Sequence, residues 1–496
     1  MNQSSTLKRL VRAVLIFAIA AVMADVSASN PKREFRGAWM QTVFQDGYRT
    51  RTTEQNKQFI SSELDKLKAA GINAVIFQVR PQSDAFYDSQ IEPWSRFLTD
   101  GGKAPVPYWD PLKYIIDEAH ARGMELHAWL NPYRVTSTAK QTLPAKHIYH
   151  KHPERFVRYG GKLYFDPGQP ENMAYIKKVV ADIVKRYDVD GIHMDDYFYP
   201  YPDKGKVFGD SKSFARYGKG LKRGDWRRDN VNRLVKSLNE EIKSIKPWVR
   251  FGISPFGIWR NKANDSRGSE TRGLQNYDAL YADVLLWAEK GWVDYLIPQI
   301  YWDMEHPMAP YGTLVDWWNK NCCDRDLYIG QNVDVTMNKA DVAPSGQRTQ
   351  LASKIEMTRT AQKVGGNCWW PASSLTKNVG GVADSLSRYH QSTVALPPAY
   401  PALSNSLPEG VSDLNFKRGV LSWSANAPAG RADDCIRFVV YRFDNDEEFD
   451  LENAANIVAV TPGHSIKVDK AGYYVVTALD RVNNESLPSE AIKIKP

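Results

Sequence analysis

The sequence predicts an α/β protein in which a (β/α)8 barrel, or TIM barrel, is followed by a small all-β sandwich. Two observations support this expectation. Short apolar runs alternate with longer amphipathic segments between about residues 36 and 373, and closely spaced strand signals replace them after about residue 396. A chain of 496 residues is also long enough for more than one packed core.

The barrel strands are expected at eight apolar runs bounded by turn residues: Gly37–Val43, Ala74–Val79, Leu126–Leu130, Gly191–Met194, Phe251–Ile253, Tyr295–Ile300, Leu327–Ile329 and Asn367–Trp370. Amphipathic helices separate them; one carries Ile60, Leu64 and Leu67 on one face and stops at Gly71. A doubly wound open sheet is the alternative, but no Gly-rich phosphate turn follows any strand.

Two long insertions interrupt the alternation of strands and helices. They are Pro81–Tyr108, after the second strand, and Pro132–Asp166, after the third. Long loops at one end of a barrel commonly carry functional groups. We therefore expect these two segments to shape a cleft.

The first 28 residues have the pattern of an export signal. Three cations, Lys8, Arg9 and Arg12, precede the apolar run Ala13–Met23, and Val26–Ala28 offers a small-residue cleavage site. A run of about 11 residues is short for a bilayer of about 30 Å, although a signal anchor remains the alternative. The sequence therefore predicts a protein exported to the periplasm or the extracellular space, with no permanent membrane span.

The charge pattern limits the kinds of binding partner that we expect. Removing this signal lowers the formal net charge from +8 to +6, because Asp25 leaves with the three cations. Lysine and arginine are scattered rather than clustered, which argues against nucleic acid, and a mild positive excess suits an anionic polymer. No protein partner is indicated.

The four cysteines do not have metal-site spacing, so we expect no metal and no cofactor. We expect small buried thiols, with at most one bridge from Cys368 to Cys322 or Cys323, since adjacent cysteines pair only with strain.

The expected domains are a signal at 1–28, the barrel at 29–395 and the sandwich at 396–496. The proline-rich segment Leu396–Pro401 is typical of a stiff linker. Strand signals follow at Leu421–Trp423, Phe438–Tyr441, Ile466–Val468 and Tyr473–Ala478. The Leu-x-Trp strand and the pattern Tyr474–Asp480, ahead of Asn483–Ser486, resemble a fibronectin type III module. Such modules space or bind, so we assign this part no catalysis.

Catalytic groups of a (β/α)8 barrel lie at the carboxyl ends of its strands. Those ends carry many polar and aromatic side chains, including Gln41, Trp129, Ser254 and Trp370. Flat aromatic faces suit pyranose rings, and paired carboxyl groups can cleave glycosidic bonds. The sequence thus favours a carbohydrate-active cleft.

Asp190–Pro200 is the most informative segment for chemistry. Strand alternation would direct Asp195 into the barrel mouth and Asp196 towards a neighbouring strand or loop. We propose Asp195 as nucleophile or base, and Asp196 or Asp84 as the partner acid. A turn-closing or calcium-binding Asp pair is the alternative, and Asp84 could equally pair with Arg80.

The residues expected to contact substrate are Trp39, Gln78, Arg80, Asn131, Tyr133, Arg134, His193, Tyr197, Trp259, Gln299, Tyr301, Trp302 and Asp303. Several have a structural alternative: packing for Trp259 and Trp302, interior hydrogen bonding for His193, loop anchoring for Arg134 and a solvated loop charge for Asp303.

Several runs together closely resemble the glycosyl hydrolase-like family 10 over about residues 34 to 373. They are Phe35–Trp39, Gly71–Pro81, Asp110–Leu112, Glu118–Met124, His127–Arg134, Asp190–Pro200, Phe251–Pro255 and Pro298–Trp302. The resemblance implies a (β/α)8 glycoside hydrolase linked to bacterial envelope glycans. A divisome-associated member is understood to cleave peptidoglycan strands stripped of stem peptides. Peptidoglycan is therefore the favoured substrate among polysaccharides.

Two other functions stay open. One is a non-catalytic carbohydrate-binding or scaffold protein, since fold does not guarantee activity. The other is a metal-dependent hydrolase or deacetylase, for which His127, His193 and Asp195 are the only plausible ligands.

Overall fold

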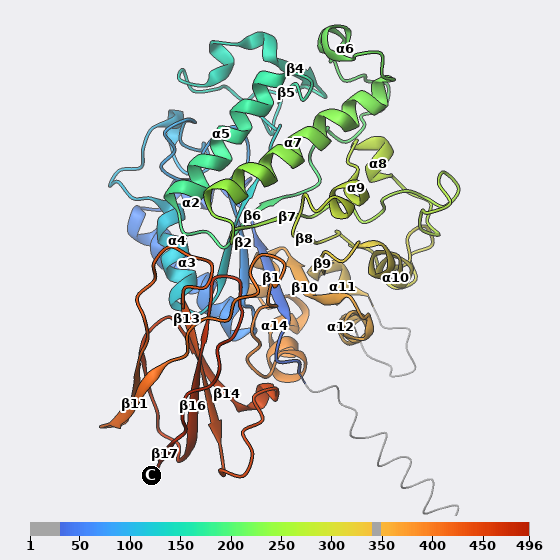
Figure 1. Cartoon of the computed structure of the whole chain (residues 1–496). Coiled ribbons are helices and arrows are strands. Elements are labelled where there is room, and N and C mark those ends of the chain that lie inside the picture. Colours follow the sequence, from blue (N-terminus) through green and yellow to red (C-terminus); the bar gives the residue numbers. More distant parts are fainter. Residues whose placement is uncertain (1–29, 340–348, 496) are drawn as a thin grey trace, which may run out of the picture.

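The computed structural model describes residues 30–339 and 349–495, so the expected export signal lies outside the described residues. Eight parallel strands close into a barrel in the order β1-β10-β9-β8-β7-β6-β3-β2 (Figure 1). They are β1 (Phe35–Met40), β2 (Ala74–Arg80), β3 (Glu125–Leu130), β6 (Gly191–Met194), β7 (Arg250–Ile253), β8 (Tyr295–Leu296), β9 (Asp326–Asn332) and β10 (Val364–Trp370). The predicted barrel is confirmed and the open sheet was the wrong alternative.

The strands coincide with the eight apolar runs, with shifts at their ends. The largest difference is at β8, which ends at Leu296 rather than at Ile300. Pro298 has no N–H to donate to a ladder, and this explains why regular pairing stops there.

The longer helices connect successive strands: α3 (Thr53–Ala69), α4 (Pro111–Ala121), α5 (Pro170–Arg186), α7 (Arg223–Ile245), α10 (Tyr311–Asn321) and α12 (Leu351–Thr360). Shorter helices are α2 (Gly47–Thr50), α6 (Ser211–Tyr217), α8 (Asn276–Ala279), α9 (Val284–Glu289), α11 (Val333–Asn338), α13 (Ala372–Thr376) and α14 (Val382–Ser385). Local signals set their starts: Thr52 and Gln55 form a capping box on α3, and Asp110 caps α4 ahead of Pro111. None of the helices in the described part of the chain is both long and apolar enough to cross a membrane.

Side chains fill the barrel interior in layers along its axis. Alternation along β3 turns Glu125, His127 and Trp129 inwards, and Tyr295 of β8 reaches the centre. Room for this ring comes from Gly252, where an added Cβ would lie 1.9 Å from the Tyr295 ring. The barrel is therefore a packed core whose only route to ligands is at its ends.

Two antiparallel sheets follow the barrel, as predicted. One has the order β11-β12-β15 and the other β14-β13-β16-β17. The strands are β11 (Ser412–Lys417), β12 (Val420–Ser424), β13 (Arg437–Phe443), β14 (Ile457–Thr461), β15 (Ser465–Lys467), β16 (Gly472–Leu479) and β17 (Ile492–Ile494). Trp423 and Phe438 pack between the sheets, whereas Val439 and Tyr441 on the other face of β13 pack with Leu396. The fibronectin type III likeness and the domain limits stay predictions.

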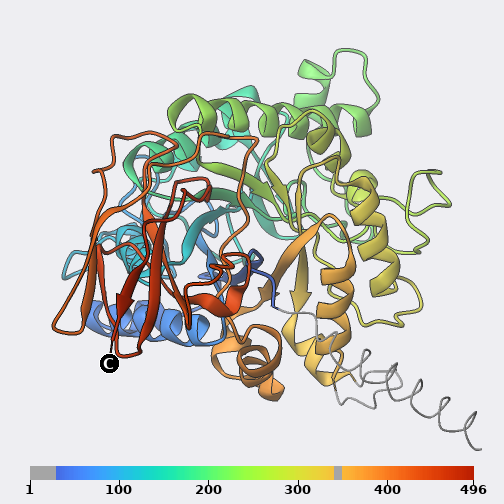
Figure 2. The same ribbon diagram turned by 60° about the horizontal axis from the view of Figure 1, so that its bottom comes forward.

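The C-terminal sheets lie against the end of the barrel at which its strands begin (Figure 2). Asn483 donates to Glu125 at the start of β3, and Arg481 pairs with Asp188 just before β6. Leu396 pairs through its backbone with Lys32 and Glu34, beside β1. The opposite end of the barrel, where the strands end, therefore remains available for a functional site.

All four cysteines are free thiols. The possible bridge from Cys368 is thus not formed, and Cys323 is exposed rather than buried.

Candidate active site

A cavity of about 390 Å³ opens at the carboxyl ends of the barrel strands. It is lined by Trp39, Gln41, Val43, Phe44, Gln78, Trp129, Arg134, Asp195, Tyr197, Ser254, Gln299, Tyr301 and Trp370. Eight of the site residues predicted from the sequence thus lie together in the structure. Seven line the cavity, and Asn131 lies behind its wall; the seven are Trp39, Gln78, Arg134, Asp195, Tyr197, Gln299 and Tyr301.

Asp195 follows β6 directly and lies in this cavity, as strand alternation predicts. Its Oδ2 accepts hydrogen bonds from Trp129 Nε1 at 3.1 Å and Asn131 Nδ2 at 2.5 Å, and its Oδ1 accepts from the Tyr197 backbone N–H at 3.1 Å. Burial raises the pKa of Asp195, although the Arg134 cation and these hydrogen bonds oppose the shift. Three N–H donors favour the ionised form of this carboxylate.

Asp196 turns away from the cavity and is 2% exposed. Its carboxyl group accepts a hydrogen bond from the Tyr201 hydroxyl. Burial, and next the negative charge of Asp195, raise the pKa of Asp196 to about 7. Asp195 has three N–H donors and the Arg134 cation nearby, whereas the side-chain donors to Asp196 are the Tyr201 hydroxyl and the Gln299 amide. We therefore assign the charge to Asp195 and the proton to Asp196 near neutral pH.

Asn131 is oriented by two donors that point at its carbonyl oxygen. Gln78 Nε2 lies 2.8 Å and Arg134 Nη2 lies 2.7 Å from Asn131 Oδ1, which leaves the Asn131 amide N–H for Asp195. Asn131 has no exposed surface. Its amide contacts Asp195 in this structure, and its role in binding substrate stays a prediction.

Arg134 combines both roles that the sequence left open. Its Nε donates to the Pro81 carbonyl at 3.0 Å and so anchors the loop after β2. The same guanidinium lies 4.9 Å from the ring centre of Tyr197, and both side chains line the cavity. Arg134 thus places a fixed positive charge beside Asp195.

His193 lies beneath the cavity floor and is fully buried. Its Nε2 is 3.3 Å from Trp39 Nε1 and 2.9 Å from Ser254 Oγ. Burial holds the pKa of His193 well below its ordinary value, so the ring is neutral. The ring contacts two residues that line the cavity, the interior alternative, and a contact of His193 with substrate stays a prediction.

Asp84 lies in a second cavity, of about 240 Å³, between the two long loops. It accepts from Ser95 Oγ and the Arg96 backbone N–H, both at 3.1 Å. Arg80 instead pairs with Glu92 at 2.7 Å, with both side chains fully buried. The Asp84–Arg80 pair is therefore wrong, and neither residue lines the cavity that holds Asp195.

Four further expected contacts lie outside that cavity. Tyr133 and Trp259 are each 1% exposed, and Trp259 stacks on Trp317 at 5.8 Å between ring centres. Trp302 packs edge-on against Phe256, and Asp303 faces Lys339 at 3.9 Å. Side-chain packing explains the positions of Tyr133, Trp259 and Trp302, and Asp303 is a loop charge beside Lys339.

Two features were not assigned from the sequence. Tyr201, the partner of Asp196, lies in a loop without periodicity, so no pattern could identify it. Trp129 and Trp370 were noted at strand ends but not assigned to substrate; they meet edge to face at 6.1 Å in the cavity wall.

Within residues 30–339 and 349–495, no group of three or more His, Cys, Asp or Glu side chains could hold a metal ion. His127, one of the three ligands considered, is held by Tyr295 and Glu125 instead.

Comparison with known proteins shows which family the chain belongs to. A family model described as Glycosyl hydrolase-like 10 matches residues 34–343. Glycosyl hydrolase YngK of Bacillus subtilis is 37% identical over 98% of both chains. Glycosyl hydrolase DigH of Escherichia coli K12 is 40% identical over 59% of this chain and 71% of its own length. A solved α-L-fucosidase isoenzyme of Paenibacillus thiaminolyticus is 12% identical, with a TM-score of 0.44 over 73% of this chain and 51% of its own. Since the family model spans more than half of the sequence, the chain belongs to the glycosyl hydrolase-like 10 family.

Proposed function

We propose that this protein is an exported glycoside hydrolase that cleaves glycosidic bonds of a bacterial envelope or extracellular glycan, with peptidoglycan strands as the favoured substrate. Family membership supports the class of reaction. The preference for peptidoglycan rests on the family resemblance, and export rests on the N-terminal sequence pattern. The mild positive charge is compatible with an anionic polymer.

The observation that carries the proposal is the environment of Asp195. Its carboxylate sits in the cavity, held by Trp129, Asn131 and the Tyr197 backbone, so it is ionised and oriented before substrate arrives. In the proposed reaction Asp195 either attacks the anomeric carbon or takes a proton from the attacking water. The glycosidic C–O bond breaks, and the leaving oxygen receives a proton.

Asp196 is the proposed source of that proton. A pKa of about 7 keeps it largely protonated at and below neutral pH, as a general acid requires. Because Asp196 lies behind the cavity wall, delivery requires the Tyr197–Tyr201 segment to shift when substrate binds.

The aromatic residues around Asp195 suit a sugar chain. Trp129 and Trp370 form one part of the wall, and Tyr301 meets Trp39 edge to face at 6.4 Å. Such faces cover the apolar side of pyranose rings, while Gln41 and Gln299 supply amides for hydroxyl groups.

The specific test is release of new reducing ends from amidase-treated peptidoglycan. Asp195→Asn is expected to lower the rate at least about 100-fold. The matched control is Asp303→Asn. Asp303 follows β8, and its carboxylate lies outside the cavity. Full activity of Asp195→Asn would remove this residue from the mechanism.

One observation favours a second candidate, a carbohydrate-binding protein without activity. Among the residues that line this cavity, Asp195 is the single carboxylate. Tight retention of glycan strands by the wild type, with no new reducing ends across a panel of polysaccharides, would support this candidate over the enzyme.

A further inference from the structure

A line of hydrogen-bonded side chains runs through the barrel core, from the candidate active site to the C-terminal sheets. At the cavity end, Trp39 Nε1 and Ser254 Oγ meet His193 Nε2. In the middle, the Tyr295 hydroxyl lies 3.1 Å from His193 Nδ1 and 2.7 Å from His127 Nδ1. At the other end, His127 Nε2 lies 3.2 Å from Glu125 Oε2.

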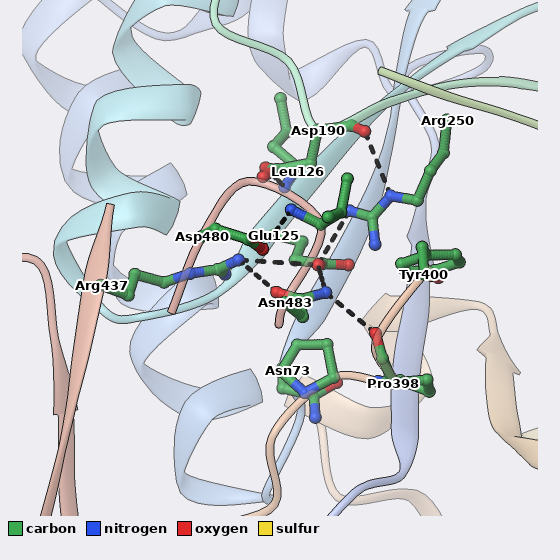
Figure 3. Close-up of polar contacts among 12 residues, drawn as sticks. Asn73, Glu125, Leu126, Asp190, Arg250, Pro398, Tyr400, Arg437, Asp480 and Asn483 are labelled. Carbon is green, nitrogen blue, oxygen red and sulfur yellow. Dashed lines mark hydrogen bonds and ion pairs between the residues drawn. The ribbon is translucent and has the colours of Figure 1, made fainter. Parts of the chain in front are cut away.

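The chain of contacts ends on the C-terminal sheets (Figure 3). Asn483 Nδ2 donates to Glu125 Oε1 at 2.8 Å, and Asn483 Oδ1 accepts from Arg437 Nη2 at 2.7 Å. Arg250 Nη2 lies 2.8 Å from the same Glu125 oxygen, and Tyr400 covers the Arg250 guanidinium at 4.2 Å. Glu125, Arg250 and Asn483 are all fully buried.

The chemistry of the two ends sets one direction for the whole line. An indole N–H only donates, so His193 Nε2 must accept and the proton of the ring is on Nδ1. His193 Nδ1–H then donates to Tyr295, whose hydroxyl donates to His127 Nδ1. His127 Nε2–H in turn donates to Glu125, because a carboxylate only accepts.

The charge states agree with this direction. Burial lowers the pKa of both His127 and His193, so both rings are neutral. Burial alone would raise the pKa of Glu125, but the Arg250 cation and the hydrogen bond from His127 lower it to about 2, against the repulsion of Asp190. Glu125 is therefore an ionised acceptor.

We infer that Glu125, which the Asn483 turn of the C-terminal sheets covers, is a positioning residue for the candidate active site. Arg250 keeps Glu125 ionised, and Asn483 holds its Oε1 while Oε2 accepts from His127, which fixes the direction of the line and hence the contacts of His193 with Trp39 and Ser254. The inference deepens the proposed function, because Trp39 and Ser254 line the cavity that holds Asp195.

Replacing Glu125 by Gln has a defined consequence at the far end. Asn483 and Arg250 both donate at the Oε1 position, so the amide oxygen of Gln takes that place and its NH2 group donates to His127 Nε2. The line then reverses, and His193 Nε2–H faces the Trp39 N–H. Because two donors cannot pair, Trp39 must move within the cavity.

The test uses the full chain with ¹⁵N-labelled histidine and does not require activity. In the wild type we expect the ring proton of His193 on Nδ1 and that of His127 on Nε2. Glu125→Gln keeps the size and shape of the side chain and should populate the opposite tautomer of both rings. Tyr295→Phe, which breaks the line at its centre, identifies the two signals by shifting both.

Glu34→Gln is the matched control. Glu34 is also a buried carboxylate, but it pairs with Arg36 and Arg359 rather than with a histidine. This variant should lose stability without changing either tautomer. Wild-type tautomers in Glu125→Gln would overturn the inference and reduce Glu125 to a counterion of Arg250.

A second readout joins the line to the proposed reaction. With amidase-treated peptidoglycan as the probe, Glu125→Gln and Tyr295→Phe should each lower kcat/KM by about 3- to 30-fold, and the double variant by no more than the larger single effect. Additive losses would contradict one shared line. If the wild type cleaves no glycan, the proposed function fails, while the tautomer measurement still decides the inference.

Discussion

Two adjacent aspartates at the end of β6 have opposite surroundings. Asp195 meets three N–H donors and a neighbouring cation, while Asp196 is buried against the Tyr201 hydroxyl. Alternation along the strand separates the two carboxyl groups, and their donors then decide which one carries the charge. This asymmetry is what an acid-and-base pair requires.

The pH dependence of activity follows from Asp196. Its pKa is raised to about 7, so the protonated, donating form is lost as the pH rises through that value. We predict that kcat falls on the alkaline side of about pH 7, measured as reducing ends released between pH 5 and 9. A rate that keeps rising up to pH 9 would contradict the role of Asp196 as acid.

Stability provides an independent measurement of the same group. A carboxyl group with a raised pKa binds its proton more tightly in the folded state, so its contribution to stability decreases as the pH rises from about 4 to 7. Asn at position 196 has no such penalty. We predict that Asp196→Asn raises Tm relative to the wild type more at pH 8 than at pH 5, and an equal change at both values would contradict the raised pKa.

Asn131 allows the role of the donors to be tested alone. Asn131→Ala removes the 2.5 Å hydrogen bond to Asp195, so burial is less opposed and the pKa of Asp195 rises further. The acidic limb of the activity profile should move to higher pH. Gln141→Ala, a change to a loop amide in the second cavity, should leave that limb in place.

At the scale of elements, buried polar contacts hold the long loops that build the cavity end. The Arg80 guanidinium at the end of β2 binds Glu92 in the following loop and donates to the carbonyl groups of Asn131 and Pro132. One side chain thus joins the loops after β2 and β3.

Breaking this buried pair should be costly. Glu92→Gln leaves the Arg80 charge without its counterion, and we predict a loss of about 3–5 kcal/mol in the free energy of unfolding. Asp117→Asn, which removes the exposed pair with Lys113, should change it by at most about 0.5 kcal/mol. Similar effects of the two substitutions in urea unfolding would refute the structural role of Arg80.

Sequence patterns predicted elements better than contacts. Apolar runs located all eight barrel strands, and alternation placed Asp195 in the cavity because strand geometry is local. The contacts of Arg80, Asp84 and Trp259 could not be predicted, because the loop paths after β2 and β7 decide which partners they meet. Glu92, the actual partner of Arg80, lies in a loop without any periodic signal.

At the scale of the whole molecule, the C-terminal sheets and the barrel share buried charges. Glu125 and Arg250 of the barrel are covered by Asn483, Arg437 and Tyr400 from later in the chain. From its sequence this part is expected to be a spacing or binding module, since nothing local indicates that its Asn483 turn reaches the barrel core.

This shared interface predicts cooperative unfolding. Exposing one part would uncover fully buried charged groups of the other, so calorimetry of the full chain should give one transition. Asn483→Gly should lower its midpoint without splitting it. Two well-separated transitions in the wild type would contradict the coupling between the barrel and the sheets.

The most direct test is mass spectrometry of peptidoglycan digested in water enriched in ¹⁸O, with and without prior amidase treatment. We predict glycan fragments whose new reducing ends carry one ¹⁸O, released by the wild type and not by Asp195→Asn, and more abundant after amidase treatment. Fragments released equally by Asp195→Asn, or no labelled ends with any glycan, would contradict hydrolysis at this cavity.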